Sequence, residues 1–409
     1  MRRGWVITLM ALSQYAALAL TILVAGWLGL LLAFARPLYA RWREPVFRHA
    51  LLILESDDWG AGPLEQAAVL TQLTQLLLRF RDQQGRAPVM TLGMILEVPD
   101  TQRIADEGRA AYHACTLQDP RFTELRASMQ QGIAAGVFVP QLHGQAHYWP
   151  PALLAAASHD EAVRAWLVTP GLPRTEALPS ALQSRWVDAS CLPSQALDRQ
   201  QIEQAAAHEA AQYQACLEQA PTVAVATTFV WTDAVEHAWR RAGVEVIITP
   251  GRRATARDGA GRPAAVDLTM LTGERSRAGQ TYLVRDVYFE PALGHTPQRL
   301  LDGLHLRTRQ GRACLAEMHR FNFLPAADAS LATLQSAMSL CLAQLPSLRF
   351  ISPLELARAI EHADATLIER ALRPRVRAWL ARLAEIPRFH RMARISGLMI
   401  VFHLLGRMA

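Results

Sequence analysis

Between Pro45 and about His362, short apolar runs rich in β-branched residues alternate with longer stretches in which apolar residues recur at steps of three and four. The short runs are typical of buried β-strands and the longer ones of helices that cover a sheet. Seven or eight such strand–helix units follow one another, from Ala50–Leu54 to Leu348–Ile351. The alternation predicts an α/β fold with a parallel sheet, because parallel neighbours are joined by crossover helices. A barrel and an open wound sheet both fit.

Composition excludes several kinds of chemistry. All 42 strongly basic residues are Arg, which rules out a Schiff-base lysine, a lysine general base and Walker-type phosphate binding. The five Cys residues lack any Cys-x-x-Cys spacing, so neither a disulfide framework nor a thiolate zinc site is indicated. The basic excess lies in the tail, where nine Arg but only one acidic residue, Glu385, occur from Arg370 onward. We therefore expect no nucleic-acid partner and a tail suited to an anionic surface.

An uncharged run extends from Trp5 to Ala35. As a helix it would be about 46 Å long, more than the roughly 30 Å of a hydrocarbon core. A membrane anchor is favoured over a cleaved signal peptide, whose apolar region is usually about 7–15 residues, although Ala33-Phe34-Ala35 has the form of a cleavage site. More Arg residues follow this run than precede it, which mildly favours a main domain on the cytoplasmic side of the membrane. The difference in number is too small to fix the orientation. The absence of Lys is typical of proteins encoded by GC-rich bacterial genomes. Together with the predicted anchor, it leads us to expect a single-pass protein of a bacterial inner membrane.

A second apolar run, Ile395–Leu405, follows an Arg-rich stretch near the C-terminus. The run is too short to span a bilayer. It fits either an interfacial helix whose Arg residues pair with anionic lipid headgroups, or an amphipathic helix that packs back on the protein. The chain is thus predicted to comprise an anchor (1–44), a main α/β domain (45–362) and a basic amphipathic tail (363–409).

Polar residues follow several of the predicted strands. Asp57 and Asp58 come after the first strand, His143 and His147 after the third, and His319 after the seventh. Functional groups of parallel α/β folds collect beyond the carboxyl ends of the strands, so we expect these side chains to meet. One Asp and two His suit Zn²⁺ or a similar divalent ion with open positions for water and substrate. The second Asp would then be free to take a proton.

These strand-end residues resemble the motifs of the polysaccharide deacetylase family, also called carbohydrate esterase family four. The motifs are Asp57-Asp58, His143-x-x-x-His147 and the later His319. Three segments are especially similar to a divergent bacterial branch, often found near surface-polysaccharide genes: Glu55–Gly60, Leu142–His147 and Arg285–Pro291. The resemblance covers about three quarters of the chain. It implies a distorted (β/α) barrel, a divalent metal, with zinc preferred, and hydrolysis of an acetyl group from a sugar.

The resemblance also implies a role for each residue. Asp58, His143 and His147 would hold the metal. Asp57 would be the general base, and His319 the general acid that protonates the leaving amine or alcohol.

One family motif is missing. An Arg that orients the base should fall near Thr228–Trp231, and none stands there. Arg285, at the end of the sixth strand, is the candidate to replace it, although it could equally form a structural ion pair with Glu290. Trp231 lies at a strand end where an aromatic ring can stack on a sugar. Trp231 and Arg285 are therefore the predicted substrate-side residues.

The leading expectation is metal-dependent hydrolysis of acetyl groups from a cell-surface polysaccharide or its lipid-linked precursor. Membrane lipid would be contacted by the N-terminal helix and in one interpretation by the basic tail. A glycoside hydrolase on a related barrel would need two opposed carboxylates about 5–9 Å apart, which Asp57 and Glu290 could supply. A non-catalytic scaffold of a polysaccharide assembly complex would usually lack a ligand, and none is missing in the sequence.

Overall fold

The computed structural model describes residues 2–324 and 327–408. Contacts between residues divide the chain into two compact units, and each is described by itself. The smaller unit comprises Met1–Val46, Arg309–Gly311 and Glu369–Ala409, and the larger comprises Phe47–Thr308 and Arg312–Ile368. Both ends of the chain thus contribute to one unit. The division into anchor, main domain and tail remains a prediction.

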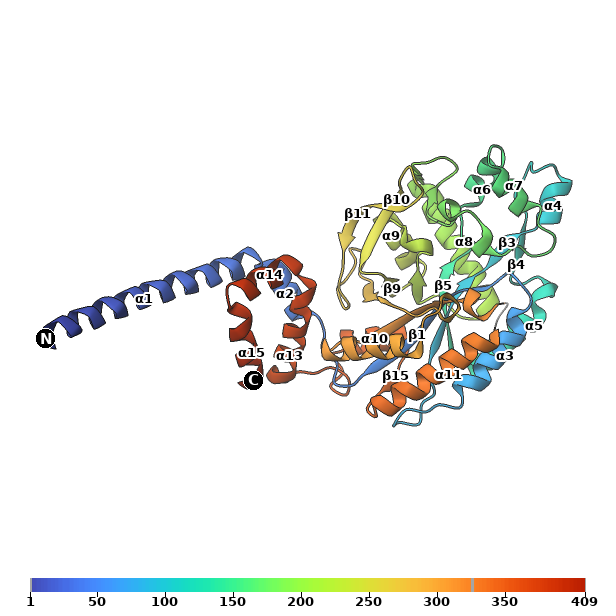
Figure 1. Cartoon of the computed structure of the whole chain (residues 1–409). Coiled ribbons are helices and arrows are strands. Elements are labelled where there is room, and N and C mark those ends of the chain that lie inside the picture. The colour runs from blue at the N-terminus through green and yellow to red at the C-terminus, as the bar shows by residue number, and fades with distance from the viewer. Residues whose placement is uncertain (1, 325–326, 409) are drawn as a thin grey trace. The chain divides into compact units, whose positions relative to one another are not determined.

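The larger unit is built on a curled parallel sheet, with helices outside it (Figure 1). Within the described residues this sheet has nine strands in the order β12-β9-β8-β5-β2-β1-β14-β13, with β15 also paired to β1. Their bounds are β1 (Leu51–Gly60), β2 (Met90–Ile95), β5 (Phe138–Gly144), β8 (Val223–Val225), β9 (Val246–Thr249), β12 (Thr281–Val284), β13 (Val287–Tyr288), β14 (Cys314–His319) and β15 (Arg349–Phe350). All pairs are parallel, which confirms the predicted α/β fold.

The two edge strands of this sheet, β12 and β13, are consecutive in the chain and are separated only by Arg285 and Asp286. The Arg285 N–H donates to the Thr249 carbonyl and so extends β12, whereas the Phe289 N–H donates to the Glu317 carbonyl and so extends β13. Because two residues reach only about 11 Å, the two edges of the sheet must meet at this point. The sheet is therefore a distorted barrel, as predicted, and Arg285 lies at its seam.

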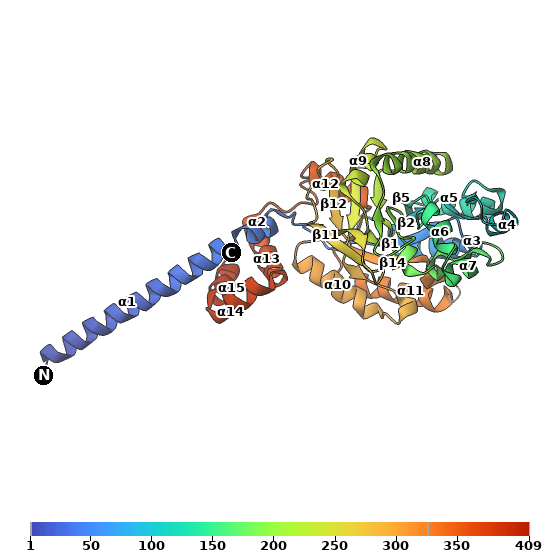
Figure 2. The same ribbon diagram turned by 90° about the horizontal axis from the view of Figure 1, so that it is seen from above.

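Six longer helices cover the outside of the barrel among the described residues (Figure 2). They are α3 (Gln66–Leu77), α5 (Thr123–Ala134), α8 (Arg199–Leu217), α9 (Asp233–Arg241), α10 (Pro297–Arg309) and α11 (Ala327–Gln344). A further helix, α12 (Pro353–Glu361), packs Leu356 and Ala357 against the interior side chains at the amino end of the strands. Helices α8 and α12 begin at capping boxes formed by Asp198 and Ser352. Smaller elements are α4 (Thr101–Asp106), α6 (Pro150–Ala157), α7 (Glu161–Leu167) and the antiparallel pairs β3–β4 (Glu97–Pro99, Ala114–Thr116), β6–β7 (Val187–Asp188, Gln195–Ala196) and β10–β11 (Arg252–Arg257, Pro263–Thr269).

The alternation of side chains along each strand separates the barrel interior from the layer beneath the helices. Leu52 and Leu54 pack in the layer beneath the helices. The interior holds a separate cluster that includes Leu51, Ile53, Val223, Val225, Val246, Ile248, Leu283 and Leu315. Continuing the same alternation along β1 brings Glu55 and Asp57 into the interior. The barrel is therefore apolar inside at the amino end of its strands and polar at the carboxyl end.

The smaller unit is helical. It contains α1 (Arg2–Ala33), α2 (Ala35–Arg43), α13 (Leu372–Arg382), α14 (Pro387–Ile395) and α15 (Leu398–Met408). Its core joins side chains from both ends of the chain, among them Leu30, Leu38, Phe389 and Phe402. The C-terminal run therefore packs back on the protein, and its partners are the N-terminal helices.

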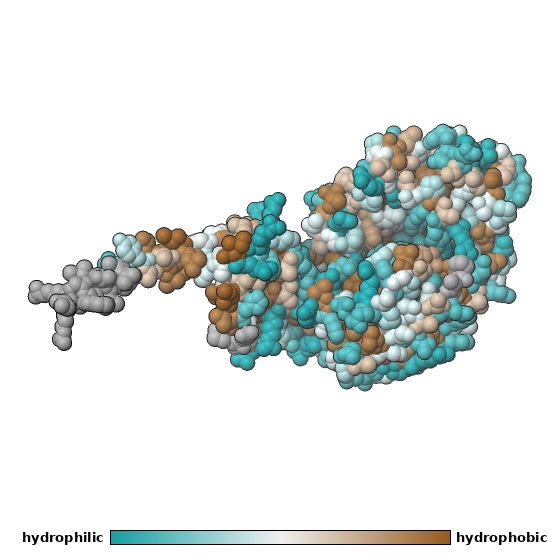
Figure 3. Space-filling model, viewed as in Figure 1, coloured by the Kyte–Doolittle hydropathy of each residue, from teal (hydrophilic) through white to brown (hydrophobic). Residues whose placement is uncertain are grey.

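Gln14–Ala33 is long and apolar enough to cross a membrane, although a signal sequence near an N-terminus would meet the same criteria. Large apolar side chains are exposed along this part of α1, which is largely brown in the space-filling view (Figure 3). They include Leu18, Leu20, Ile22, Leu28 and Leu32.

Candidate active site

Asp57 and Asp58 both face the carboxyl end of the barrel, although neighbours on a regular strand point to opposite faces. The cause is a β-bulge. The pairing of β1 with β2 changes register between Ser56 and Trp59, and Asp58 adopts a left-handed conformation with φ of 73°. Asp tolerates this conformation better than most residues do. The bulge lets one carboxylate contact Arg285 and the next contact two histidines.

Asp58, His143 and His147 form a buried cluster. Asp58 Oδ1 lies 3.4 Å from His143 Nε2 and 3.2 Å from His147 Nε2. All three ligand atoms lie within 4.8 Å of one another, and Asp58 Oδ1 has no hydrogen-bond partner among the described residues. His143 Nδ1 is 3.0 Å from the Val225 carbonyl, and this contact orients the ring so that Nε2 faces Asp58. This donor set fits a divalent cation.

The electrostatics of the cluster also suit a cation. Burial raises the pKa of Asp58, but His147 and His143 outweigh this effect and hold that pKa well below its usual range. Burial lowers the pKa of His147 to about 4, so its ring is neutral near pH 7. An ionised carboxylate and a neutral imidazole are the states that ligate a metal.

Asp57 is held by Arg285. Arg285 Nη2 donates to Asp57 Oδ2 at 2.7 Å, and both side chains are buried. Asp57 Oδ1 has no hydrogen-bond partner within the described residues. Burial raises the pKa of Asp57, but the charge of Arg285 outweighs it and keeps this pKa below its ordinary value. One oxygen of the ionised carboxylate is therefore fixed while the other has no hydrogen-bond partner among the described residues, as suits a general base.

Arg285 itself is fixed by further contacts. Its Nη1 lies 3.6 Å from Glu55 Oε2, its Nε lies 3.4 Å from Glu317 Oε2, and its guanidinium carbon lies 5.1 Å from the centre of the Phe229 ring. Burial raises the pKa of Glu55 to about 7 against the opposing charge of Arg285. Arg285 is almost wholly enclosed, so it contacts the Asp57 carboxylate and offers little surface to a substrate.

His319 lies beside Asp57, since these two residues are partners in the β1–β14 register. His319 Nδ1 is 2.6 Å from Glu290 Oε1, while its side chain remains 23% exposed. Burial lowers the pKa of His319, but the hydrogen bond to Glu290 and the charges of Asp58 and Asp57 raise it to about 9. His319 is therefore protonated near neutral pH and exposed enough to donate that proton.

Glu290 and Asn322 complete the His319 side of the site. Asn322 donates from Nδ2 to Glu290 Oε2 and to the His319 carbonyl. The sequence suggested Glu290 as a partner of Arg285, but within the described residues Glu290 bonds to His319 instead. Asn322 was missed, although its position three residues after His319 places it in the turn that follows β14.

Trp231 is not brought into this group. Its ring is fully buried, and its indole N–H donates to Glu236 Oε1 at 2.9 Å. In this conformation a sugar cannot stack on it.

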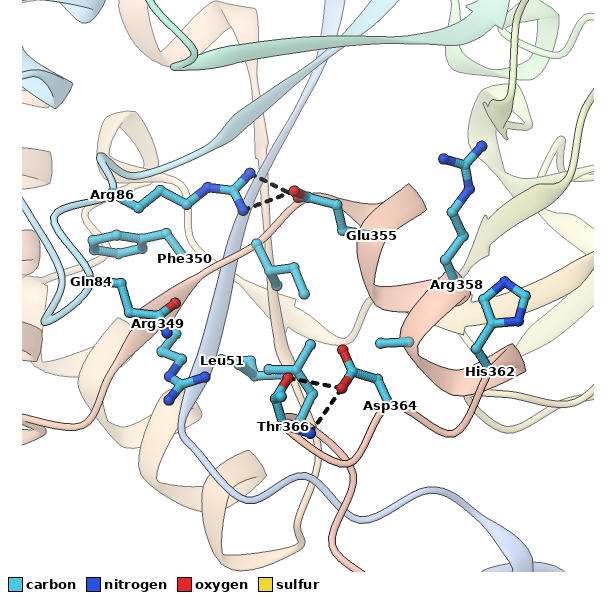
Figure 4. Close-up of a pocket in the computed structure, with 13 residues that line it drawn as sticks. Leu51, Gln84, Arg86, Arg349, Phe350, Glu355, Arg358, His362, Asp364 and Thr366 are labelled. Carbon is cyan, nitrogen blue, oxygen red and sulfur yellow. Dashed lines mark hydrogen bonds and ion pairs between the residues drawn. The ribbon is translucent and has the colours of Figure 1, made fainter.

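A pocket of about 780 Å³ lies at the opposite end of the barrel (Figure 4). It is lined by Leu51 at the start of β1 and by the Arg86–Glu355 ion pair, whose shorter N–O distance is 2.8 Å. Leu51 precedes Asp57 by six residues, or about 20 Å along the strand. This pocket is therefore separate from the cluster at the carboxyl end.

No family model and no curated protein matches the chain. Solved structures do match. A family 4 carbohydrate esterase from Streptomyces lividans, in complex with acetate, is 12% identical, with 74% of this chain and 94% of that chain covered and a TM-score of 0.35. A peptidoglycan deacetylase from Bacillus subtilis is 9% identical, with 79% and 95% covered and a TM-score of 0.31.

A 4-alpha-glucanotransferase from Thermococcus litoralis is similar to a comparable degree. It is 11% identical, with 76% of this chain but only 40% of that chain covered and a TM-score of 0.38. Likenesses this remote carry no weight in choosing an activity. A family 4 carbohydrate esterase and a peptidoglycan deacetylase are thus among the solved structures to which the chain is similar over about three quarters of its length.

Proposed function

We propose that the chain hydrolyses acetyl groups from a carbohydrate and that Asp58, His143 and His147 hold its divalent metal. The observation that carries the proposal is the pairing of Asp57 with His319 beside this cluster. The pKa of the carboxyl group is shifted down and that of the imidazole is shifted up. Neighbouring groups whose pKa values are pushed apart in this way suit a base and an acid of one reaction.

In the proposed reaction Asp57 Oδ1 accepts a proton from a water molecule, while Arg285 holds Oδ2 in place. When bound, the metal supplies Lewis acidity for the water and for the acetyl carbonyl, and its two nitrogen ligands and one oxygen ligand favour zinc. The water oxygen adds to the carbonyl carbon, and the bond from that carbon to the sugar nitrogen or oxygen breaks.

His319 supplies the proton that the leaving amine or alcohol needs. Glu290 acts through His319, because its carboxylate fixes the ring and favours the protonated form. Asn322 in turn holds Glu290. The products are acetate and the deacetylated sugar, and the proton on Asp57 returns to His319 through solvent. The proposed substrate is a surface polysaccharide or its lipid-linked precursor.

The site favours this proposal over a glycoside hydrolase. A hydrolase pair would require Asp57 and Glu290 to face a sugar from two sides. Glu290 is fully buried and both of its oxygens are engaged, by His319 and by Asn322. The scaffold alternative is disfavoured by the presence of a complete ligand cluster with a base and an acid beside it.

We further propose that α1 is retained as a membrane anchor. Leu30 is buried in the core of the smaller unit, and the ring centres of Phe34 and Phe389 are 5.6 Å apart. Trp27 donates to the Ser396 carbonyl at 2.9 Å. Cleavage after Ala35 would remove Trp27, Leu30 and Phe34 and leave the apolar faces of the C-terminal helices uncovered. The packing therefore supports retention of the helix, which we propose is a single-pass anchor in the inner membrane.

Metal content and acetate release test the proposed function. The full-length protein, purified in detergent, should contain about one divalent ion per chain and release acetate from N- or O-acetylated oligosaccharides. His143→Ala and Asp58→Ala should lose both properties, whereas His159→Ala, an exposed histidine on a turn, should keep them. A folded wild-type protein that takes up no metal after divalent ions are added would refute the proposal.

A further inference from the structure

Helices α14 and α15 carry apolar residues on two opposite sides. On one side Phe389, Ala393 and Phe402 are buried in the core of the smaller unit. On the other side Ile395 is 82% exposed and Ile400 66% exposed. Met392 and Leu404 are also more than half exposed. A helical hairpin in water normally presents polar residues on its outer side. Here four large apolar side chains lie among exposed Arg391 and Arg394, and no described residue covers them.

The turn between the two helices lies beside the apolar part of α1. Trp27 on α1 donates its indole N–H to the carbonyl of Ser396, which lies in that turn between Ile395 and Gly397. Trp27 precedes Ala33, the end of the candidate span, by six residues, or about 9 Å of helix. A membrane crossed by α1 would therefore reach the level of the turn. This step rests on the proposed anchor.

A basic groove adjoins the exposed turn. It has a volume of about 510 Å³ and is lined by Ala384, Pro387, His390, Arg391, Arg394 and Ile395. Within the described part of the chain, neither Arg391 nor Arg394 forms an ion pair with an acidic side chain, and Glu385 pairs with Arg41. Two unpaired guanidinium groups beside an apolar surface fit the phosphate of a lipid whose acyl chains lie alongside.

We propose that the turn between α14 and α15 inserts into the membrane interface beside α1, and that Arg391 and Arg394 bind the phosphate of an anionic phospholipid. Two observations select this occupant over another protein. The turn is flanked by exposed Ile395 and bonded to a helix that is itself apolar and exposed, and the groove that adjoins the turn is basic. Packing on the N-terminal helices and contact with lipid are thus both properties of the tail.

Depth-dependent quenching tests the insertion. The full-length protein carries Cys191→Ser, which removes an exposed thiol, and Ile395→Cys labelled with a fluorophore sensitive to its surroundings. In vesicles, this probe should be quenched by lipids brominated in the upper acyl chain and shielded from iodide. The control is Leu372→Cys at the start of α13, where Leu372 is 65% exposed. This position lies near Arg375, which donates to the Trp42 carbonyl at the far end of α2. The control probe should be quenched by iodide and not by the brominated lipids.

Iodide quenching at position 395 without lipid quenching would overturn the insertion. Shielding from iodide without lipid quenching would show that a second copy of the chain covers the turn, and would overturn it as well. Failure of the anchor itself is recognised separately, because the protein would then be released from membranes by alkaline carbonate. None of these results depends on acetate release.

Titration of the detergent-purified protein with dioctanoyl phosphatidylglycerol tests the groove. Arg391→Gln with Arg394→Gln should weaken binding at least tenfold. Arg373→Gln with Arg377→Gln, an exposed pair on α13 in the same unit, removes equal charge and should leave binding unchanged. Inorganic phosphate at the same concentration should not compete. Equal binding by the two double variants, or full competition by inorganic phosphate, would overturn the proposal of a lipid-phosphate site.

Discussion

Gly93 on β2 lies directly against Asp57 on β1. A Cβ atom added at Gly93 would meet Asp57 Oδ1 at 2.4 Å and the Asp57 Cα at 3.0 Å. Real Cβ atoms do not approach other atoms so closely, so a side chain at position 93 would displace the Asp57 carboxylate. The oxygen in question is the one that accepts the proton in the proposed reaction.

Gly93→Ala should therefore lower kcat by about 100-fold, because a displacement of about 1 Å is enough to cost that much in a positioned catalytic group. Metal content should stay the same, since the three nearest atoms that the added Cβ would meet all belong to Asp57 and none to a metal ligand. Gly259→Ala is the matched control, because a Cβ there meets no atom within 4 Å. Loss of metal together with activity in Gly93→Ala would contradict this explanation.

Arg285→Gln should shift the acidic limb of the kcat/KM profile to higher pH. In the wild type the charge of Arg285 holds the pKa of Asp57 below its ordinary value, so the base is ionised across the neutral range. Without that charge, burial dominates and the pKa of Asp57 rises. Activity should fall by at least 100-fold at pH 6 and recover in part at higher pH. A uniform loss at every pH would show that Arg285 does not act through Asp57.

Glu290→Gln should shift the alkaline limb in the opposite direction, to lower pH. The proposed acid must be protonated, and Glu290 contributes to raising the pKa of His319 to about 9. Removing the negative charge lowers that pKa toward the ordinary value of about 6.5. Activity should therefore be lost as pH rises from about 6.5 instead of about 9. An unchanged alkaline limb would exclude His319 as the group that titrates there.

Glu55→Gln should raise the melting temperature more at pH 8 than at pH 5. The pKa of buried Glu55 is raised from 4.5 to about 7, so the folded state holds this proton more tightly than the unfolded state does. The stabilising contribution is complete below pH 4.5 and is lost as pH rises through about 7. Gln keeps the shape without the charge. Thermal unfolding of both proteins across this range tests the sign, and a larger gain at pH 5 would contradict it.

Local patterns in the sequence were sufficient to predict most strands of the main sheet, their parallel arrangement and the meeting of Asp58 with His143 and His147. These predictions follow from strand alternation and from the common edge of a parallel sheet. The features that the sequence did not indicate depend on contacts between distant segments. The bulge that turns Asp57 and Asp58 to one side is visible only against β2.

The burial of Trp231 and the need for Gly93 likewise depend on neighbouring strands and helices. Nothing near Trp231 in the sequence shows that Glu236 will receive its indole N–H. Packing of the C-terminal run on α1 joins residues that are 369 positions apart in the case of Trp27 and Ser396. Periodicity shows that such a helix has an apolar face, but not which surface covers it.

The seam of the barrel links closure of the sheet to assembly of the candidate active site. Arg285 belongs to the two-residue crossing that joins the first and last edges of the sheet, and the same side chain holds the Asp57 carboxylate. A chain in which only the first strands have formed contains Asp57, the proposed base. It does not yet have Arg285 in place to orient and ionise the Asp57 carboxylate. Under the proposed function, closure of the sheet and assembly of the Asp57–Arg285 pair are therefore one event.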